Sequence, residues 1–159
     1  MIHKEKEAVN FAFINDHEQI LRLTNLAISK KAGSKNVIDQ MSWHLHRHLY
    51  VEEKLLFTYM DLLPNDQRKS IINKTLEEHD RLLYYFRLVK RDIDNKGRLK
   101  NFRDYLHSHL DFELDGFYET LEKELTREEK KKFLNEINKP IKLGFYPIRK
   151  LRKFHLYSK

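Results

Sequence analysis

The chain has 159 residues, of which 35% are charged, and it contains only four glycines, three prolines and no cysteine. This length suits one domain with a single core, and the lack of cysteine excludes disulfides, thiolate metal sites and cysteine nucleophiles. The formal charge of +7 lies in residues 139–159, which hold seven cations and no acid, so residues 1–138 carry no net charge.

Four helices of similar length are predicted in chain order, at about residues 4–31, 36–62, 66–94 and 98–124, with ends uncertain by about 2–4 residues. Turn-forming residues separate them: Gly33 with Ser34, then Pro64 to Asp66, then Asp94 to Gly97. Apolar residues recur at steps of three and four in each segment, as in helices that bury one face. The pattern predicts an all-α protein built as an up-down-up-down antiparallel four-helix bundle.

A short C-terminal helix is predicted after the bundle, because Thr126-Arg-Glu-Glu forms a capping box ahead of Phe133 and Leu134. We therefore divide the chain into a bundle at residues 1–125 and a helical extension with a basic tail at residues 126–159. The tail mixes apolar and basic residues. It either packs on the bundle or contacts an anionic membrane surface or acidic partner.

Several function classes find no support. The chain lacks a phosphate-binding glycine loop and a Ser-His-Asp order, and its body has no basic surface pattern, so no nucleic-acid partner is expected. No apolar run has the length of a signal peptide core or the roughly 20 residues of a membrane span. We expect a cytoplasmic protein, and the sequence leaves its oligomeric state open.

Four histidines recur at nearly equal intervals. His17, His48, His79 and His109 are separated by 31, 31 and 30 residues. This is about the length of one helix and a loop, so antiparallel helices would bring one imidazole each to a similar height in the bundle. The spacing predicts a metal site inside the bundle.

Two glutamates extend this pattern. Glu52 and Glu113 follow His48 and His109 by four residues, which places each pair on one helical face about 5–6 Å apart. A buried carboxylate costs several kcal/mol unless it is compensated, and the predicted inward faces hold no Lys or Arg. Cations would compensate both glutamates. Imidazole and carboxylate ligands without sulfur suit iron or manganese, and zinc less well.

The layout resembles the hemerythrin-like family, in its HHE cation-binding branch. The resemblance covers roughly residues 8–122 and rests on a histidine in the first helix, His-Leu-Tyr-Val-Glu-Glu in the second, Glu-His in the third and His-Leu-Asp-Phe-Glu in the fourth. It implies a non-haem di-iron centre bridged by an oxo or hydroxo group. The implied terminal ligands are His17, His48, His79 and His109. The implied bridging carboxylates are Glu52 and Glu113.

Several functions follow from this resemblance. It implies binding or sensing of oxygen, nitric oxide or peroxide at the metal site, or a part in iron handling or iron-centre repair. Two alternatives of other classes stay open. One is a di-iron oxidase or peroxidase, and the other is a non-catalytic interaction module that uses the basic tail.

The chain departs from the oxygen-carrying hemerythrins, which have a second histidine four residues from the first in the third helix and an aspartate five residues after the histidine of the fourth. Here the positions four residues before and after His79 hold Thr75 and Leu83. The position five residues after His109 holds Leu114. One iron would thus lack a protein ligand and offer a position to an exchangeable water.

Three further polar residues lie close to the predicted ligands in the sequence. His44, one turn before His48, is either a further ligand or a hydrogen-bonding partner of a ligand. Glu53 and Glu78 adjoin ligands in sequence, but they are turned by about 100° around the helix and are predicted to face solvent.

Overall fold

The computed structural model describes residues 2–30, 35–59 and 65–137. Within these ranges the chain is helical and has no strand. The helices are α1 (Ile2–Ser29), α2 (Lys35–Tyr59), α3 (Asn65–Arg91), α4 (Lys96–Phe112), α5 (Tyr118–Glu124) and α6 (Arg127–Ile137). A π-helical turn, η2 (Glu113–Phe117), joins α4 to α5.

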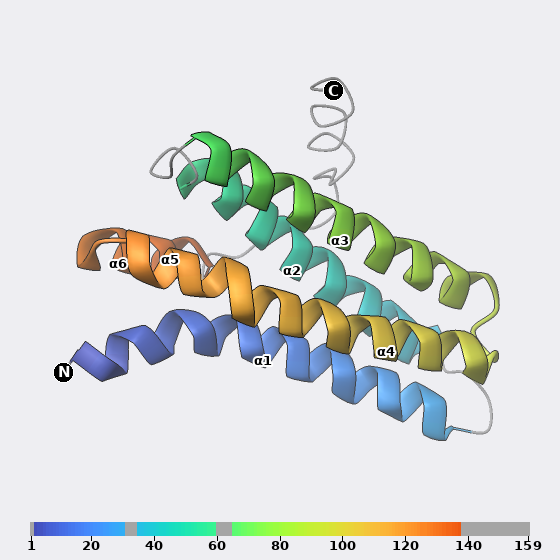
Figure 1. Ribbon diagram of the computed structural model, residues 1–159. Helices are drawn as coiled ribbons and strands as arrows, with labels where there is room; N and C mark the ends of the chain where they lie inside the picture. The colour runs from blue at the N-terminus through green and yellow to red at the C-terminus, as the bar shows by residue number, and fades with distance from the viewer. Residues whose placement is uncertain (1, 31–34, 60–64, 138–159) are drawn as a thin grey trace.

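The four long helices run alternately up and down, and α4, η2 and α5 together form the fourth rod of the bundle (Figure 1). Each rod packs against two others, since α1 contacts α2 and α4, and α3 contacts α4 and α2. The predicted all-α bundle with a short C-terminal helix is confirmed, and the described helix ends lie within a few residues of those predicted. The fourth helix was predicted as continuous, and there the structure differs because of η2.

Local sequence signals account for two helix starts. The side chain of Asn95 accepts a hydrogen bond of 3.1 Å from the backbone N–H of Arg98 and so caps α4. The capping box before α6 is formed as predicted. The backbone N–H of Thr126 donates to Glu129 Oε2 at 2.7 Å, and that of Glu129 donates to Thr126 Oγ1 at 3.2 Å.

Helix α6 packs back on the bundle. Its Phe133 is fully buried, and the ion pairs Lys54–Glu136 and Lys130–Glu122 connect it to α2 and α5. The division of the chain after residue 125 stays a prediction, and the basic tail lies outside the described residues.

The apolar core fills the half of the bundle nearest the α1–α2 and α3–α4 connections. All four long helices contribute to it, with Phe86 and Phe102 ring centroids 5.3 Å apart near its centre. Beyond the predicted ligands, on α3 and α5, lie the buried Leu76 and the ring of Tyr118. The polar cluster is thus enclosed between two apolar layers. No helix in the described part of the chain is long and apolar enough to cross a membrane.

Candidate metal centre

The structure brings all six predicted site residues together in the bundle interior, each with no solvent-exposed surface. They come from all four rods. The contributions are His17 from α1, His48 and Glu52 from α2, His79 from α3, His109 from α4, and Glu113 from the start of η2.

The carboxylate of Glu113 lies at the middle of the cluster. Its Oε2 is 2.9 Å from Nε2 of His17 and 3.9 Å from Nε2 of His48. Its Oε1 is 2.5 Å from Nε2 of His109 and 3.8 Å from Nε2 of His79. The two oxygens of one carboxylate therefore face two different pairs of histidines.

Glu52 repeats this division. Its Oε1 is 3.1 Å from Nε2 of His48, and its Oε2 is 3.0 Å from Nε2 of His79. The ring centroids agree with it, because His17 and His48 are 4.2 Å apart, whereas each lies more than 6 Å from His109. The cluster thus has two donor sets, one around His17 and His48 and one around His79 and His109. Each receives one oxygen from each glutamate.

The close contacts in the cluster are not all hydrogen bonds. Among the described residues, neither nitrogen of His17 or His109 has a hydrogen-bond partner, and nor does Oε1 of Glu113, although the atoms lie at hydrogen-bonding distance. Short distances without hydrogen bonds are expected where donor atoms converge on a common centre. An unsatisfied buried polar group costs about 1–3 kcal/mol, and coordination of a cation would remove that cost.

The donor atoms also gather closely enough for metal ions. His17, His48, His109 and Glu113 each offer an atom within 4.8 Å of the others, and Glu52, His79, His109 and Glu113 form a second such group. Four imidazoles and two carboxylates without a thiolate make a donor set suited to iron or manganese. The residues present therefore fit a pair of cations.

The charges of the cluster shift its pKa values. Burial opposes ionisation of Glu113, but the imidazoles of His109, His17 and His79 hold its pKa well below the usual value. Burial and the charge of Glu113 act to raise the pKa of Glu52, but contacts with His48 and His79 outweigh them and lower it. Burial also disfavours the cationic form of His79, yet contacts with Glu113, Glu52 and Glu53 raise its pKa well above normal. Both glutamates are thus ionised and attract cations.

Carboxylates also lie on the outer side of three histidines. Nδ1 of His79 donates to Glu53 Oε1 at 2.9 Å, while Nδ1 of His48 is 3.9 Å from Asp16 Oδ2. Nδ1 of His109 is 3.9 Å from Glu78 Oε2. Such partners orient metal-binding imidazoles and raise their basicity.

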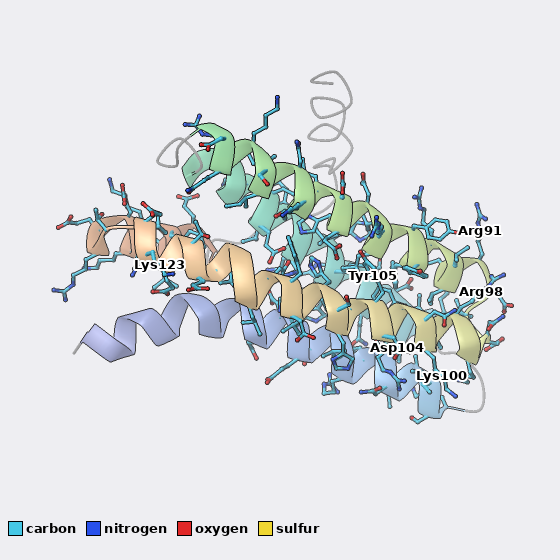
Figure 2. All side chains as sticks on the ribbon, in the orientation of Figure 1. Arg91, Arg98, Lys100, Asp104, Tyr105 and Lys123 are labelled. Carbon is cyan, nitrogen blue, oxygen red and sulfur yellow. The ribbon has the colours of Figure 1, made fainter. Side chains whose placement is uncertain are left out.

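Two predictions about these neighbours are corrected. Glu53 was expected to face solvent, yet it is fully buried, because the interface of α2 and α3 covers it and His79 provides a donor. Glu78 retains 21% of its side-chain exposure but points toward α4, where Tyr105 donates a hydrogen bond of 2.8 Å to it. Figure 2 shows Tyr105 between α4 and α3.

Tyr118, the first residue of α5, also reaches the cluster and has no signal in the sequence that marks it. Its side chain is buried, and its hydroxyl donates to Glu52 Oε1 at 2.5 Å and to Glu113 Oε2 at 3.1 Å. Burial and the negative charges of the two glutamates raise the pKa of Tyr118 well above its usual value. Tyr118 is five residues from Glu113, and in an unbroken α-helix it would lie about 140° around the axis.

The remaining candidates lie outside the two donor groups. His44 is half-buried, its ring stands perpendicular to that of Trp43 at 4.8 Å, and burial lowers its pKa. Leu114 is 37% exposed, whereas Leu83 and Thr75 are buried. Neither leucine has a donor atom to offer to the cluster.

Comparison with known proteins agrees with this geometry. The family model described as Hemerythrin HHE cation binding domain matches residues 10–131, which include all six predicted ligands and Tyr118. No curated protein and no solved structure shows a significant match. Because the family match spans most of the chain and the structure gathers its histidines and glutamates into cation-binding groups, the chain belongs to the hemerythrin HHE cation-binding domain family.

Proposed function

We propose that this protein holds two non-haem iron ions inside the bundle and uses them to bind or sense oxygen, nitric oxide or peroxide. His17 and His48 would be terminal ligands of one ion, and His79 and His109 of the other. Glu52 and Glu113 would bridge the two ions, together with an oxo or hydroxo group.

The observation that carries this proposal is the division of the two carboxylates. Each glutamate directs one oxygen toward each histidine pair, with nitrogen–oxygen distances of 2.5–3.9 Å. Ligands about 2.0–2.2 Å from one ion and at right angles to each other lie about 2.8–3.1 Å apart, and opposite ligands lie about 4.2 Å apart. Carboxylates that bridge two ions account for this arrangement. An ion pair between one glutamate and one histidine would explain the position of only one of the two carboxylate oxygens.

The side chains of this protein would also control what reaches the ions. The apolar layers on both sides of the cluster exclude bulk water and strengthen electrostatic interactions inside. Iron bound here would supply a redox-active centre for a small ligand. Leu83, one turn after His79, has no donor atom, which leaves room near His79 for such a ligand in place of a side chain.

Metal analysis with an absorption spectrum tests the proposal. We expect two iron atoms per chain and the charge-transfer bands of a bridged ferric pair. The variant carrying both His48→Ala and Glu52→Ala should lose both, while a variant at the exposed His107, His107→Ala, should keep them. A folded wild-type chain that cannot be loaded with iron would refute the proposal.

A di-iron oxidase or peroxidase is the second candidate function. It is favoured by the same lack of a donor atom at Leu83, because an open position permits turnover as well as reversible binding. Steady consumption of peroxide by the iron-loaded protein would support an enzyme. A stable complex with oxygen or nitric oxide that releases its ligand unchanged would support a carrier or sensor.

The alternative of an interaction module depends on the basic tail, which lies outside the described residues. It predicts that function survives the loss of His48 and Glu52. A cytoplasmic location and contact of the tail with an anionic surface both stay predictions.

A further inference from the structure

The hydroxyl of Tyr118 lies among the predicted metal ligands. It contacts Oε1 of Glu52 and Oε2 of Glu113, which are the oxygens that face His48 and His17. Both of these hydrogen bonds place Tyr118 beside the donor set around His17 and His48.

The spacing of these atoms is that of ligands around one ion. The phenolic oxygen is 2.5 and 3.1 Å from the two carboxylate oxygens, and those oxygens are 3.1 and 2.9 Å from Nε2 of His48 and His17. Neighbouring ligands of an ion with bond lengths of about 2.0–2.2 Å are about 2.8–3.1 Å apart. Five donors from three of the four rods are thus spaced as neighbouring ligands are, whereas the set around His79 and His109 has four.

The π-helical turn explains how Tyr118 reaches this position. Its backbone N–H donates to the carbonyl of Glu113, five residues earlier, instead of to a residue four earlier. The wider turn returns Tyr118 to the helical face of Glu113 and directs its ring into the bundle. Single π turns in α-helices occur frequently at functional sites.

Leu114 makes this placement chemically useful. It directly follows Glu113, but its side chain is apolar and 37% exposed and offers no donor atom. A phenolic oxygen is a hard donor that suits ferric iron, as a carboxylate oxygen does. The chain can therefore replace a missing oxygen ligand with one from the next turn.

We propose that the phenolic oxygen of Tyr118 is a seventh protein ligand, bound to the ion that His17 and His48 hold. This inference rests on the proposed di-iron function and deepens it. With five protein donors on that ion and four on the other, the exchangeable position belongs to the ion at His79 and His109. The two ions are then unequal, and only the ion at His79 and His109 is open to an external ligand.

Visible absorption and resonance Raman spectra of the ferric-loaded protein test the proposal. Wild type should show a phenolate-to-ferric charge-transfer band, and excitation in that band should enhance tyrosine ring vibrations. Tyr118→Phe should lose both signals while still binding two iron atoms, because the ring and its packing are retained. The matched control is Tyr105→Phe, which removes another hydroxyl bonded to a carboxylate and should keep both signals.

The outcomes separate this inference from the proposed function. If wild type and Tyr118→Phe hold two iron atoms and have the same spectrum, Tyr118 is only a hydrogen-bond donor and the inference fails alone. If wild type binds no iron, both proposals fail. Should Tyr118→Phe not fold, wild type grown with ring-deuterated tyrosine decides: the enhanced vibrations shift if tyrosine is a ligand, and unshifted or absent vibrations overturn the inference.

Discussion

Glu53 and His79 form a fully buried hydrogen bond of 2.9 Å, made by Nδ1 on the side of the ring opposite to the nitrogen that faces Glu52. Two other histidines have a carboxylate in the same place, although at 3.9 Å: Asp16 beside His48 and Glu78 beside His109. Each of these carboxylates adjoins a predicted ligand in sequence but serves the histidine of the next helix. The bundle therefore links α1 to α2, α2 to α3, and α3 to α4 through its outer carboxylates.

Loss of the Glu53 charge should weaken metal binding. In Glu53→Gln the side chain keeps its shape and an acceptor oxygen, but His79 becomes less basic. We expect the affinity for iron to fall by about 10–100-fold, the usual cost of removing such a partner. Chelator competition measures this, with the exposed Glu77→Gln on α3 as the control. Equal affinities of the two variants would contradict the orienting role of Glu53.

Glu113 should be required for the second ion. Glu113→Gln leaves one oxygen and replaces the other by an amide nitrogen, which cannot bind a cation. Because the two oxygens face different histidine pairs, we expect at most one iron atom per chain instead of two. The control is Glu119→Gln, at an exposed residue six positions later. Iron content per chain is the measurement, and two atoms in Glu113→Gln would refute the bridging arrangement.

The stability of the metal-free protein should depend on pH through the cluster. The pKa values of Glu52 and Glu113 are lowered from 4.5, so their contribution is present above that pH and is lost as the pH falls through the folded-state values. The pKa of His79 is raised from 6.5, so its contribution is present below that pH and is lost as the pH rises through the raised value. The cluster should thus stabilise the metal-free fold most between pH 4.5 and 6.5.

With metal bound, the stability of the protein should rise with pH above about 6.5, where the stability of the metal-free protein falls. Ligand imidazoles must be free of the metal-facing proton, so metal affinity rises with pH. At a free metal concentration of about 100 times Kd, binding adds about 2.7 kcal/mol, or roughly 5–10 °C in Tm for a chain of this size. Thermal unfolding with iron or with a chelator should show a difference that grows from about pH 5 to about pH 8. A constant difference would indicate that metal binds elsewhere.

A histidine at position 83 should restore the ligand that the oxygen carriers have. Leu83 is buried one turn after His79, so Leu83→His should destabilise the metal-free protein by about 1–3 kcal/mol through an unsatisfied polar group. Added iron should recover this loss. In the control Val89→His, at a buried residue ten positions after His79, the loss should persist with iron. Urea unfolding with and without iron distinguishes the two. A loss in Leu83→His that iron does not recover would place this residue outside the centre.

The bundle and its six central residues could be predicted from the sequence. The three- and four-residue steps of apolar residues and the intervals between the histidines indicate which side chains face inward. His17, His48, His79 and His109 are about one helix and loop apart, and the structure places them together. Glu53 was predicted to face solvent, since an angle of about 100° from Glu52 directs it away from the central axis. That angle directs it toward α3 instead, and only the packing of α2 on α3 determines that it is buried.

Tyr118 could not be predicted for a different reason. An unbroken α-helix directs it away from Glu113, and no sequence signal between Glu113 and Phe117 announces a π turn. The π turn contains one residue more than an α-helical turn, and a prediction of one continuous helix does not include it. Two adjacent buried carboxylates favour a hydroxyl donor between them, and this would have pointed to Tyr118. That argument requires knowing that Glu52 and Glu113 are neighbours, which the structure shows.

Anomalous diffraction at the iron absorption edge from crystals of the iron-loaded protein tests the central claim most directly. We expect two iron peaks between Glu52 and Glu113, one about 2.0–2.2 Å from Nε2 of His17 and His48 and the other at the same distance from His79 and His109. Iron peaks elsewhere in the molecule, with the six side chains bonded only to one another, would contradict it.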